Sequence, residues 1–426
     1  MWTLIILGIL LLITLISLFK IQPFLSFLIV SILMGLAYGI KPAVLIEAIQ
    51  KGIGTTLGSI ISIIVLGAMI GKMIAKSNAT IIITDRLVQV FGPKNLPLAF
   101  MIIGFIIGIP LFFSVAFLLM APLVLSTAKR NNINPIYLGI PMLASLSITQ
   151  GFLPPHPAPY YLVTHLPGAK MGTTLGLGII ISIPAMLISG WLFGKTLKDF
   201  TCNPLNFTSE ETLEINPSFL ESILVLLLPV ILIASHSFID NTFFASVGDP
   251  IIALLISLCA AIYLLGFKRN ISWKSMQIWL IDAIKEVAPL ILTFGGAGAF
   301  KEILQVMHLG DQILLITNNS LVNPLIIAWL IAAALRVITG SSTVAGITTA
   351  GLILPILLKN GINPNLLALS IGSGSMVLSH VNDSGFWLFK EYFGVSIKNT
   401  LRSWTIMETI LAIVGLIGVL ILQNFV

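Results

Sequence analysis

The sequence predicts an all-α polytopic membrane protein. It is expected to be an inverted repeat of two five-helix halves, each with a re-entrant helical hairpin and a broken transmembrane helix. Three observations support this class. Hydrophobic residues make up 57% of the 426 positions and charged residues only 9%, whereas about a quarter of a soluble domain is charged. Apolar runs of roughly 20 residues, long enough to cross a bilayer, recur from end to end. The chain also matches itself at a fixed spacing.

The composition argues against several other classes. Cys202 and Cys259 fit neither a disulfide framework nor a metal-ligand spacing, so we expect no metal and no cofactor. The net charge of +6 is spread over loops and forms no basic face suited to phosphates, which argues against a nucleic-acid partner. The first apolar run, 2–19, lacks a basic start and a small-residue cleavage site, so we expect a retained helix there.

The self-match divides the chain into two related halves, 1–195 and 218–426, joined by the polar linker 196–217. Three pairs of segments share one spacing of 229 positions: Gly67–Ile74 with Gly296–Ile303, Val115–Ala116 with Val344–Ala345, and Asn131–Pro135 with Asn360–Pro364. Agreement at three places makes chance an unsatisfactory explanation, and internal repeats of this kind are common in transporters.

Each half is expected to cross the membrane five times, at 2–19, 22–39, 53–76, 136–166 and 172–194, and at 218–235, 249–266, 286–306, 365–389 and 404–424. An odd number of crossings forces the two halves to insert in opposite orientations. If the linker is cytoplasmic, most Lys and Arg residues also fall on the cytoplasmic side, as the positive-inside rule requires. Both termini would then face outward.

Two further apolar segments are too long for a simple crossing. The segment 98–128 has 31 residues without a charge, and 321–358 has 38 with only Arg336. As single helices they would be about 46 and 57 Å long, against a hydrocarbon core of about 30 Å. Each has a break near its middle, at Gly108–Ser114 and Thr339–Thr343. We therefore predict two re-entrant hairpins; one long tilted helix or two thin crossings are the alternatives.

The crossing that follows each hairpin is itself interrupted. Within 136–166, three of four successive positions are proline, which a helix interior does not tolerate: Pro154, Pro155 and Pro157. The equivalent place in 365–389 reads "SHVNDSGFW" (Ser379–Trp387). Irregular backbone at membrane depth survives only where protein buries it or it lines a cavity. The two hairpin tips and the two broken helices therefore predict one central site, which includes Ser114 of the first tip.

Charged residues within the apolar segments are the strongest candidates for function. Arg336 stands alone in its stretch, and its fork of donors suits a carboxylate; a structural pairing with a carbonyl or with Asp383 is the alternative. A charge at a helix centre costs about 2.5–3.5 kcal/mol, so Asp383 is expected to take up a proton or help hold a cation, with His380 as its titrating neighbour. The alternative for Asp383 is a helix cap. Asn382 is expected to meet substrate hydroxyl groups.

The remaining site candidates are polar groups at the breaks. Gly340, Ser341, Ser342 and Thr343 offer hydroxyls and exposed backbone to a polyhydroxylated or carboxylated ligand, although small residues also permit close helix packing. His156 lies among prolines, where no helical neighbour satisfies its ring nitrogens. We expect it to line the cavity, with a buried structural histidine as the alternative.

At these residues the chain resembles the gluconate permease family, the gluconate:proton symporters of the ion transporter superfamily. The resemblance lies in "SHVNDSGFWLFKEYF" (Ser379–Phe393), "SWTIMET" (Ser403–Thr409), "GFLPPHPAP" (Gly151–Pro159), "RVITGSSTVAGITTAG" (Arg336–Gly351) and "GGAGAFKEIL" (Gly295–Leu304). It implies a carrier and not an enzyme, with hairpins and broken helices, usually dimeric, so a homodimer is expected. It also implies import of a small sugar acid with protons through the inner membrane.

The chain departs from the family pattern at two positions. Ser114 stands where many relatives have the acid of a Phe-Phe-Glu-Val-Gly stretch, and Ala158 replaces the glycine after Pro-Pro-His-Pro. If that acid carries the proton in relatives, coupling here must rely on Asp383 with a histidine, or differ in kind. A sodium-coupled carrier, or a carrier of glycerate or D-serine, is therefore an alternative. An intramembrane enzyme is a further alternative, and the inverted repeat argues against it. A channel is another, and the lack of a filter motif argues against that.

Overall fold

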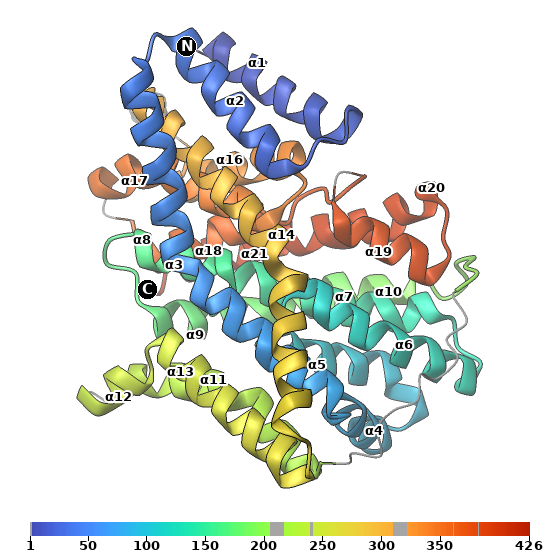
Figure 1. Cartoon of the computed structure of the whole chain (residues 1–426). Coiled ribbons are helices and arrows are strands. Elements are labelled where there is room, and N and C mark those ends of the chain that lie inside the picture. Colours follow the sequence, from blue (N-terminus) through green and yellow to red (C-terminus); the bar gives the residue numbers. More distant parts are fainter. Residues whose placement is uncertain (1, 205–216, 239–241, 310–321, 361, 382) are drawn as a thin grey trace.

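The computed structural model describes the whole chain except residues 1, 205–216, 239–241, 310–321, 361 and 382 (Figure 1). Every regular element among the described residues is helical, which confirms the all-α prediction. These elements are α1 (Trp2–Ile13), η1 (Thr14–Leu18), α2 (Pro23–Tyr38), α3 (Pro42–Lys76), α4 (Ala79–Phe91), η2 (Pro93–Asn95), α5 (Leu96–Gly108), α6 (Phe113–Asn131), α7 (Pro135–Phe152), α8 (Pro157–His165), α9 (Met171–Met186), η3 (Leu187–Leu192), α10 (Phe193–Lys195), α11 (Phe219–Phe238), α12 (Thr242–Val247), α13 (Pro250–Ala261), η4 (Ile262–Gly266), η5 (Phe267–Arg269), α14 (Trp273–Val306), α16 (Pro324–Thr339), α17 (Ser342–Asn360), α18 (Pro364–Gly374), α19 (Ser384–Phe393), α20 (Ile397–Thr400), η6 (Leu401–Thr405) and α21 (Ile406–Leu422).

Four of these helices begin with the same short signal. An Asn or Asp side chain accepts a hydrogen bond from the first turn, and a proline follows it at the first helical position. The capping residues are Asn134, Asp249, Asn323 and Asn363. The cap satisfies a backbone N–H that the helix leaves free, and proline has the helical φ with no N–H to lose. The starts of α7, α13, α16 and α18 are therefore determined locally.

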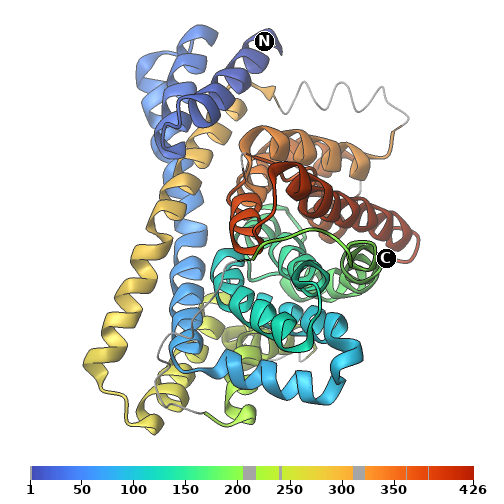
Figure 2. The ribbon, with the colours of Figure 1, turned by 90° about the vertical axis from the view of Figure 1, so that its right-hand side faces the viewer.

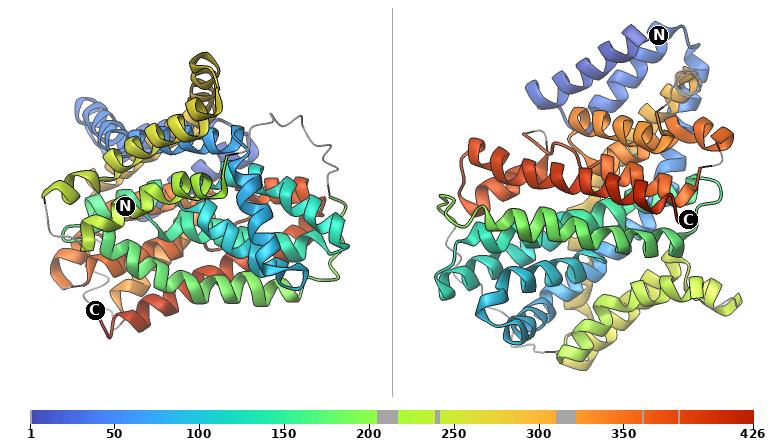
Figure 3. Two further views of the ribbon diagram at one scale, coloured as in Figure 1. Left: turned by 90° about the horizontal axis from the view of Figure 1, so that it is seen from below. Right: turned by 180° about the vertical axis from the view of Figure 1, so that it is seen from behind.

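The helices are arranged as a pair of long helices beside a bundle. α3 and α14, of 35 and 34 residues, pack against each other along one side of the molecule (Figures 1 and 2). α1 and α2 lie at one end of this pair, and α11 to α13 lie at the other (Figure 1). The bundle beside the pair contains α5 to α9 and α16 to α21, with α9 packed against α21 at the back (Figure 3).

The two long helices begin earlier than the sequence indicated. Crossings were expected to begin at residues 53 and 286, whereas α3 begins at Pro42 and α14 at Trp273. Because a helix can continue outside the hydrocarbon core, the crossings at 53–76 and 286–306 stay predictions within these longer helices. Charged residues connect the two long helices: Lys51 of α3, for example, lies 2.7 Å from Glu302 of α14. At about 52 Å, such helices must extend beyond the hydrocarbon core of about 30 Å or cross it at a steep tilt.

The number of full-length crossings also differs from the ten expected. Among the described residues, six helices are long and apolar enough to cross a bilayer, or up to seven if the bent pair α4–α5 forms one span. Part of the difference arises where helices are short or interrupted, and α14, of 34 residues, is not among the six. α1 and α2 have only 12 and 16 residues, and the expected crossing 365–389 is divided between α18 and α19, of 11 and 10 residues.

Four interruptions of the bundle helices occur near the places marked in the sequence. α5 and α6 are joined by 109–112, α7 and α8 by 153–156, α16 and α17 by 340–341, and α18 and α19 by 375–383. Proline, glycine and short polar residues concentrate at these breaks, because they interrupt helical hydrogen bonding at little cost. The division into repeats at 1–195 and 218–426, the re-entrant course of the helix pairs and the homodimer stay predictions, and most of the linker lies outside the described residues.

We expect Gly298→Ala to destabilise the packing of α14 on α3. A Cβ atom at Gly298 would overlap the carbonyl oxygen of Gly52 and the side chain of Thr56, both in α3. A backbone carbonyl and a β-branched side chain cannot move aside easily, so the free energy of unfolding should fall by about 1–3 kcal/mol. Thermal unfolding of the purified protein in detergent measures this as a lower melting temperature.

Gly58→Ala is the matched control, since a Cβ atom at this exposed position of α3 meets nothing within 4 Å. Alanine favours a helix over glycine by up to about 1 kcal/mol, so the control should be neutral or stabilising. Equal melting temperatures for the two variants would show that the close approach of the two backbones contributes nothing to stability.

Candidate functional site

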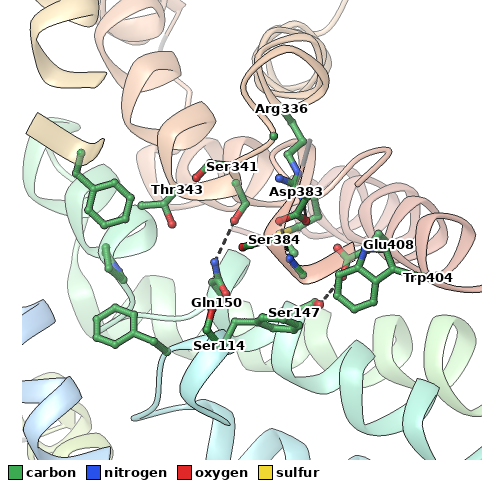
Figure 4. A pocket seen from close by; sticks show the side chains of 18 residues that line it. Ser114, Ser147, Gln150, Arg336, Ser341, Thr343, Asp383, Ser384, Trp404 and Glu408 are labelled. Atoms are coloured by element: carbon green, nitrogen blue, oxygen red, sulfur yellow. Dashed lines mark hydrogen bonds and ion pairs between the residues drawn. The ribbon is translucent and has the colours of Figure 1, made fainter. Parts of the chain in front are cut away.

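A polar cavity lies where the four interrupted segments meet (Figure 4). It brings together eight of the residues expected from the sequence: Ser114, Pro157, Arg336, Gly340, Ser341, Ser342, Thr343 and Asp383. The other lining residues are Phe112, Phe113, Ser147, Gln150, Phe294, Met376, Ser384, Gly385, Trp404 and Glu408. The lining therefore combines aromatic side chains with hydroxyls, an amide and charged groups.

Arg336, near the end of α16, is the cation of this cavity. Its side chain is only 3% exposed, and Nη2 donates a hydrogen bond to Asp383 Oδ2 at 2.5 Å. The pairing with Asp383, one of the alternatives from the sequence, is thus present. It uses only part of the guanidinium: among the described residues, buried Nε and Nη1 have no hydrogen-bond partner. Because buried polar groups are normally hydrogen-bonded, these two donors are available to an anionic ligand.

Asp383 is held by several donors at the start of α19. Its carboxylate accepts hydrogen bonds from the Ser379 hydroxyl and from the backbone N–H of Gly385, in addition to the bond from Arg336. The expected helix-cap role is therefore also present. Trp404 Nε1 donates to Ser379 Oγ at 2.7 Å, so the indole supports the same group. This network orients Asp383, and Asp383 in turn orients Arg336.

The break between α16 and α17 presents hydroxyl groups to the cavity. Gly340 ends α16 with φ of +69°, a conformation that glycine adopts without strain, and its N–H bonds to the carbonyl oxygen of Arg336. Ser341, Ser342 and Thr343 follow immediately and line the cavity. Gln150 Nε2 of α7 donates to Ser342 Oγ at 3.2 Å and so connects the two sets of interrupted helices.

Four helices begin at this cavity. The lining residues include the first residue of α6 (Phe113), of α8 (Pro157), of α17 (Ser342) and of α19 (Ser384). The N-terminus of a helix carries a partial positive charge, which favours an anion, although the Ser341 hydroxyl and the Asp383 carboxylate already accept N–H groups at the starts of α17 and α19. Together with the two free donors of Arg336, these helix ends make the cavity suited to a carboxylate.

Four of the expected site residues that the structure describes do not line this cavity. His156 is 4% exposed, and its Nε2 lies 2.7 Å from the carbonyl oxygen of Gly108. With Pro155 it lines a separate, smaller pocket, so its expected place in the central cavity is corrected to a contact that ties α8 to the end of α5. His380 is half-buried, with Nε2 3.2 Å from the carbonyl oxygen of Val337. Pro154 is buried in the turn before α8, and Asn382 lies outside the described residues.

Glu408 is the main cavity residue that the sequence reading missed. It is 1% exposed, lies in the first turn of α21 and accepts a hydrogen bond from the Ser147 hydroxyl of α7. It is the last charged residue of the chain and precedes a long apolar run. A charge next to or within an apolar stretch is the feature that identified Arg336. Its place near the start of the expected crossing 404–424 gave no sign in the sequence that Glu408 is buried. Ser147 and Gln150 had no comparable signal in the sequence.

Several apolar spans, interrupted helices and a buried cavity with an arginine define the class: a multi-pass membrane protein with the organisation of a secondary transporter. The chain belongs to the GntP family of permeases, whose family model matches residues 1–426. It is 41% identical to the gluconate permease of Bacillus subtilis, over 98% of each chain. It is also 39% identical to the Gnt-II system L-idonate transporter of Escherichia coli, over 97% of each chain. These findings confirm the resemblance seen in the sequence.

A solved structure shows the same fold. The crystal structure of the Alcanivorax borkumensis YdaH transporter, described as having an unusual topology, superposes with a TM-score of 0.68. The match covers 95% of this chain and 98% of that one at 14% sequence identity. At that identity the comparison concerns the arrangement of helices and not the substrate.

Proposed function

We propose that this protein is a secondary carrier that imports a small sugar acid of the gluconate type, together with protons, across the inner membrane. The observation that carries this proposal is Arg336, which lines a polar cavity and whose buried Nε and Nη1 have no hydrogen-bond partner among the described residues. The names of the relatives support the substrate class, since the two quoted above are a gluconate permease and an L-idonate transporter.

The cavity offers a distinct partner to each part of such a substrate. Arg336 binds the carboxylate through its two free donors, which a planar guanidinium presents in fixed geometry. Ser341, Ser342 and Thr343 exchange hydrogen bonds with the hydroxyl groups of the sugar chain. Aromatic lining residues such as Phe112 and Phe294 cover the C–H surface of the sugar chain. Asp383 is a positioning residue, because it holds Arg336 and not the ligand.

Transport by purified protein in liposomes tests this function. We expect labelled gluconate or idonate to exchange across the membrane, and to accumulate when the outside is made acidic. Shorter acids such as glycerate have the carboxylate but fewer hydroxyls, so they should compete more weakly. Substrate recovered unchanged from the lumen separates a carrier from an enzyme, and saturation of the rate separates a carrier from a channel.

Other results would replace parts of the proposal. Accumulation that follows a sodium gradient at constant pH would replace protons with sodium as the coupling ion. Stronger competition by D-serine or glycerate than by any hexonate would replace the substrate. No exchange of any carboxylic acid by folded protein would contradict the proposed function as a whole.

A further inference from the structure

Glu408 is a buried carboxylate that takes no part in the ligand contacts proposed above. Oε1 accepts a hydrogen bond from Ser147, but Oε2 has no partner among the described residues although it is buried. The residue lines the same cavity as Arg336 (Figure 4). A carboxylate in such a place costs several kcal/mol if it is ionised and unpaired, and much less if it carries a proton.

The charges around Glu408 leave its negative charge unmatched. Arg336 of α16 and Asp383 before α19 are the charged groups that face it across the cavity. They are paired with each other and sum to zero. α7, α9, α18 and η3 also pack against α21, and their sequences contain no Asp, Glu, Lys, Arg or His. η6 packs against α21 as well and carries Arg402, which is exposed and does not line the cavity. Within the described residues, the cavity therefore has one surplus negative charge whenever Glu408 is ionised.

We infer that Glu408 is the proton-binding group of this carrier, and that one proton on Oε2 accompanies one substrate anion bound at Arg336. The inference rests on the proposed function and names the coupling residue of that same site. It moves this role from Asp383, which is bound by three donors, to the carboxylate with a free oxygen.

Coupling follows from the charge count of the cavity. A substrate carboxylate that enters beside ionised Glu408 raises the surplus to two negative charges, whereas protonation of Glu408 keeps it at one. Proton and anion therefore each favour binding of the other, and the size of that effect is reciprocal. The empty site with ionised Glu408 and the loaded site with proton and anion carry the same charge. The transport cycle should thus be electroneutral for a monoanion.

The test compares wild-type protein with Glu408→Gln. The three measurements are the pH dependence of gluconate affinity, transport by exchange and by accumulation, and the response to a membrane potential. The amide resembles the protonated acid in shape but cannot release a proton. Wild-type affinity for gluconate should fall about tenfold per pH unit above the midpoint of the Glu408 titration, since one proton is linked to binding. The variant should bind with an affinity that does not change with pH. It should still exchange labelled for unlabelled gluconate, because the exchange needs no proton release, but should fail to accumulate gluconate under a pH gradient.

The third measurement concerns the net charge that crosses the membrane in one transport cycle. An imposed membrane potential at equal pH should not drive accumulation by wild-type protein, whereas an acidic exterior should. Glu47→Gln is the matched control: it makes the same substitution at an exposed position of α3 outside the cavity and should leave all three properties unchanged.

Ser147→Ala supplies an independent variant if Glu408→Gln does not fold. The Ser147 hydroxyl donates to the Glu408 carboxylate and so favours its ionised form. Without that donor the proton is held more tightly, and the pH midpoint of gluconate affinity should move upward by about one unit, a tenfold change in proton affinity. An unchanged midpoint in this variant would overturn the assignment.

The outcomes separate the inference from the proposed function. Wild-type protein that exchanges no sugar acid at any pH would overturn both. Normal exchange by wild-type protein, with a wild-type pH slope and pH-driven accumulation in Glu408→Gln, would overturn the inference alone. Accumulation driven by the membrane potential in wild-type protein would overturn the one-proton, one-anion count.

Discussion

Replacing Arg336 with lysine is expected to reduce gluconate affinity by about 100-fold or more. Lysine keeps a positive charge near Asp383 but has neither Nε nor the second guanidinium nitrogen, the two donors without a partner in the described part of the chain. Each hydrogen bond to a charged group contributes about 1.5–3 kcal/mol, and losing two corresponds to a factor of about 100 or greater. Equilibrium binding of labelled gluconate to the purified variant measures the loss.

Arg269→Lys is the control for this substitution. Arg269 is also partly buried and paired with an acid, Glu221, but it does not line the cavity. Its replacement should leave gluconate affinity at the wild-type value. If Arg336→Lys binds gluconate as tightly as wild type, the guanidinium is a structural partner of Asp383 only, and the anion must bind elsewhere.

Asp383→Ala should cause the largest loss of stability among the cavity substitutions. It leaves the buried guanidinium of Arg336 without its counter-charge, and it removes the side chain that accepts from the Gly385 N–H at the start of α19. Breaking a buried ion pair by removing one partner costs about 3–5 kcal/mol. We expect a clear fall in the melting temperature and, because Arg336 is no longer held, a loss of gluconate binding as well.

Asp249→Ala provides the comparison. Asp249 caps α13 in the same way but is exposed, and within the described part of the chain its side chain accepts from backbone N–H groups of that helix. Loss of a cap alone costs typically about 1 kcal/mol, so its melting temperature should fall much less. A similar fall in both variants would mean that the cap, and not the ion pair with Arg336, accounts for the effect at position 383.

Much of the fold and part of the site follow from local features of the sequence. Helix starts are set by Asn–Pro or Asp–Pro pairs, and helix breaks by Pro154–Pro157 and by Gly340 and its hydroxyl neighbours, since each acts within one turn of the chain. Arg336 and Asp383 were recognisable because a charge in an apolar run has a large cost that needs a compensating partner. These signals need no knowledge of which helices are neighbours.

The partners of these groups depend on contacts between segments far apart in the chain. Ser147 meets Glu408 across 261 positions, and Gln150 meets Ser342 across 192. His156 turns toward Gly108 and not into the central cavity. Which side of a helix faces a cavity is set by the helices packed around it, and a one-residue rotation of about 100° changes it. Residue type and local breaks therefore predicted a membrane carrier with a central polar site, while long-range packing selected the carboxylate left without a partner inside it.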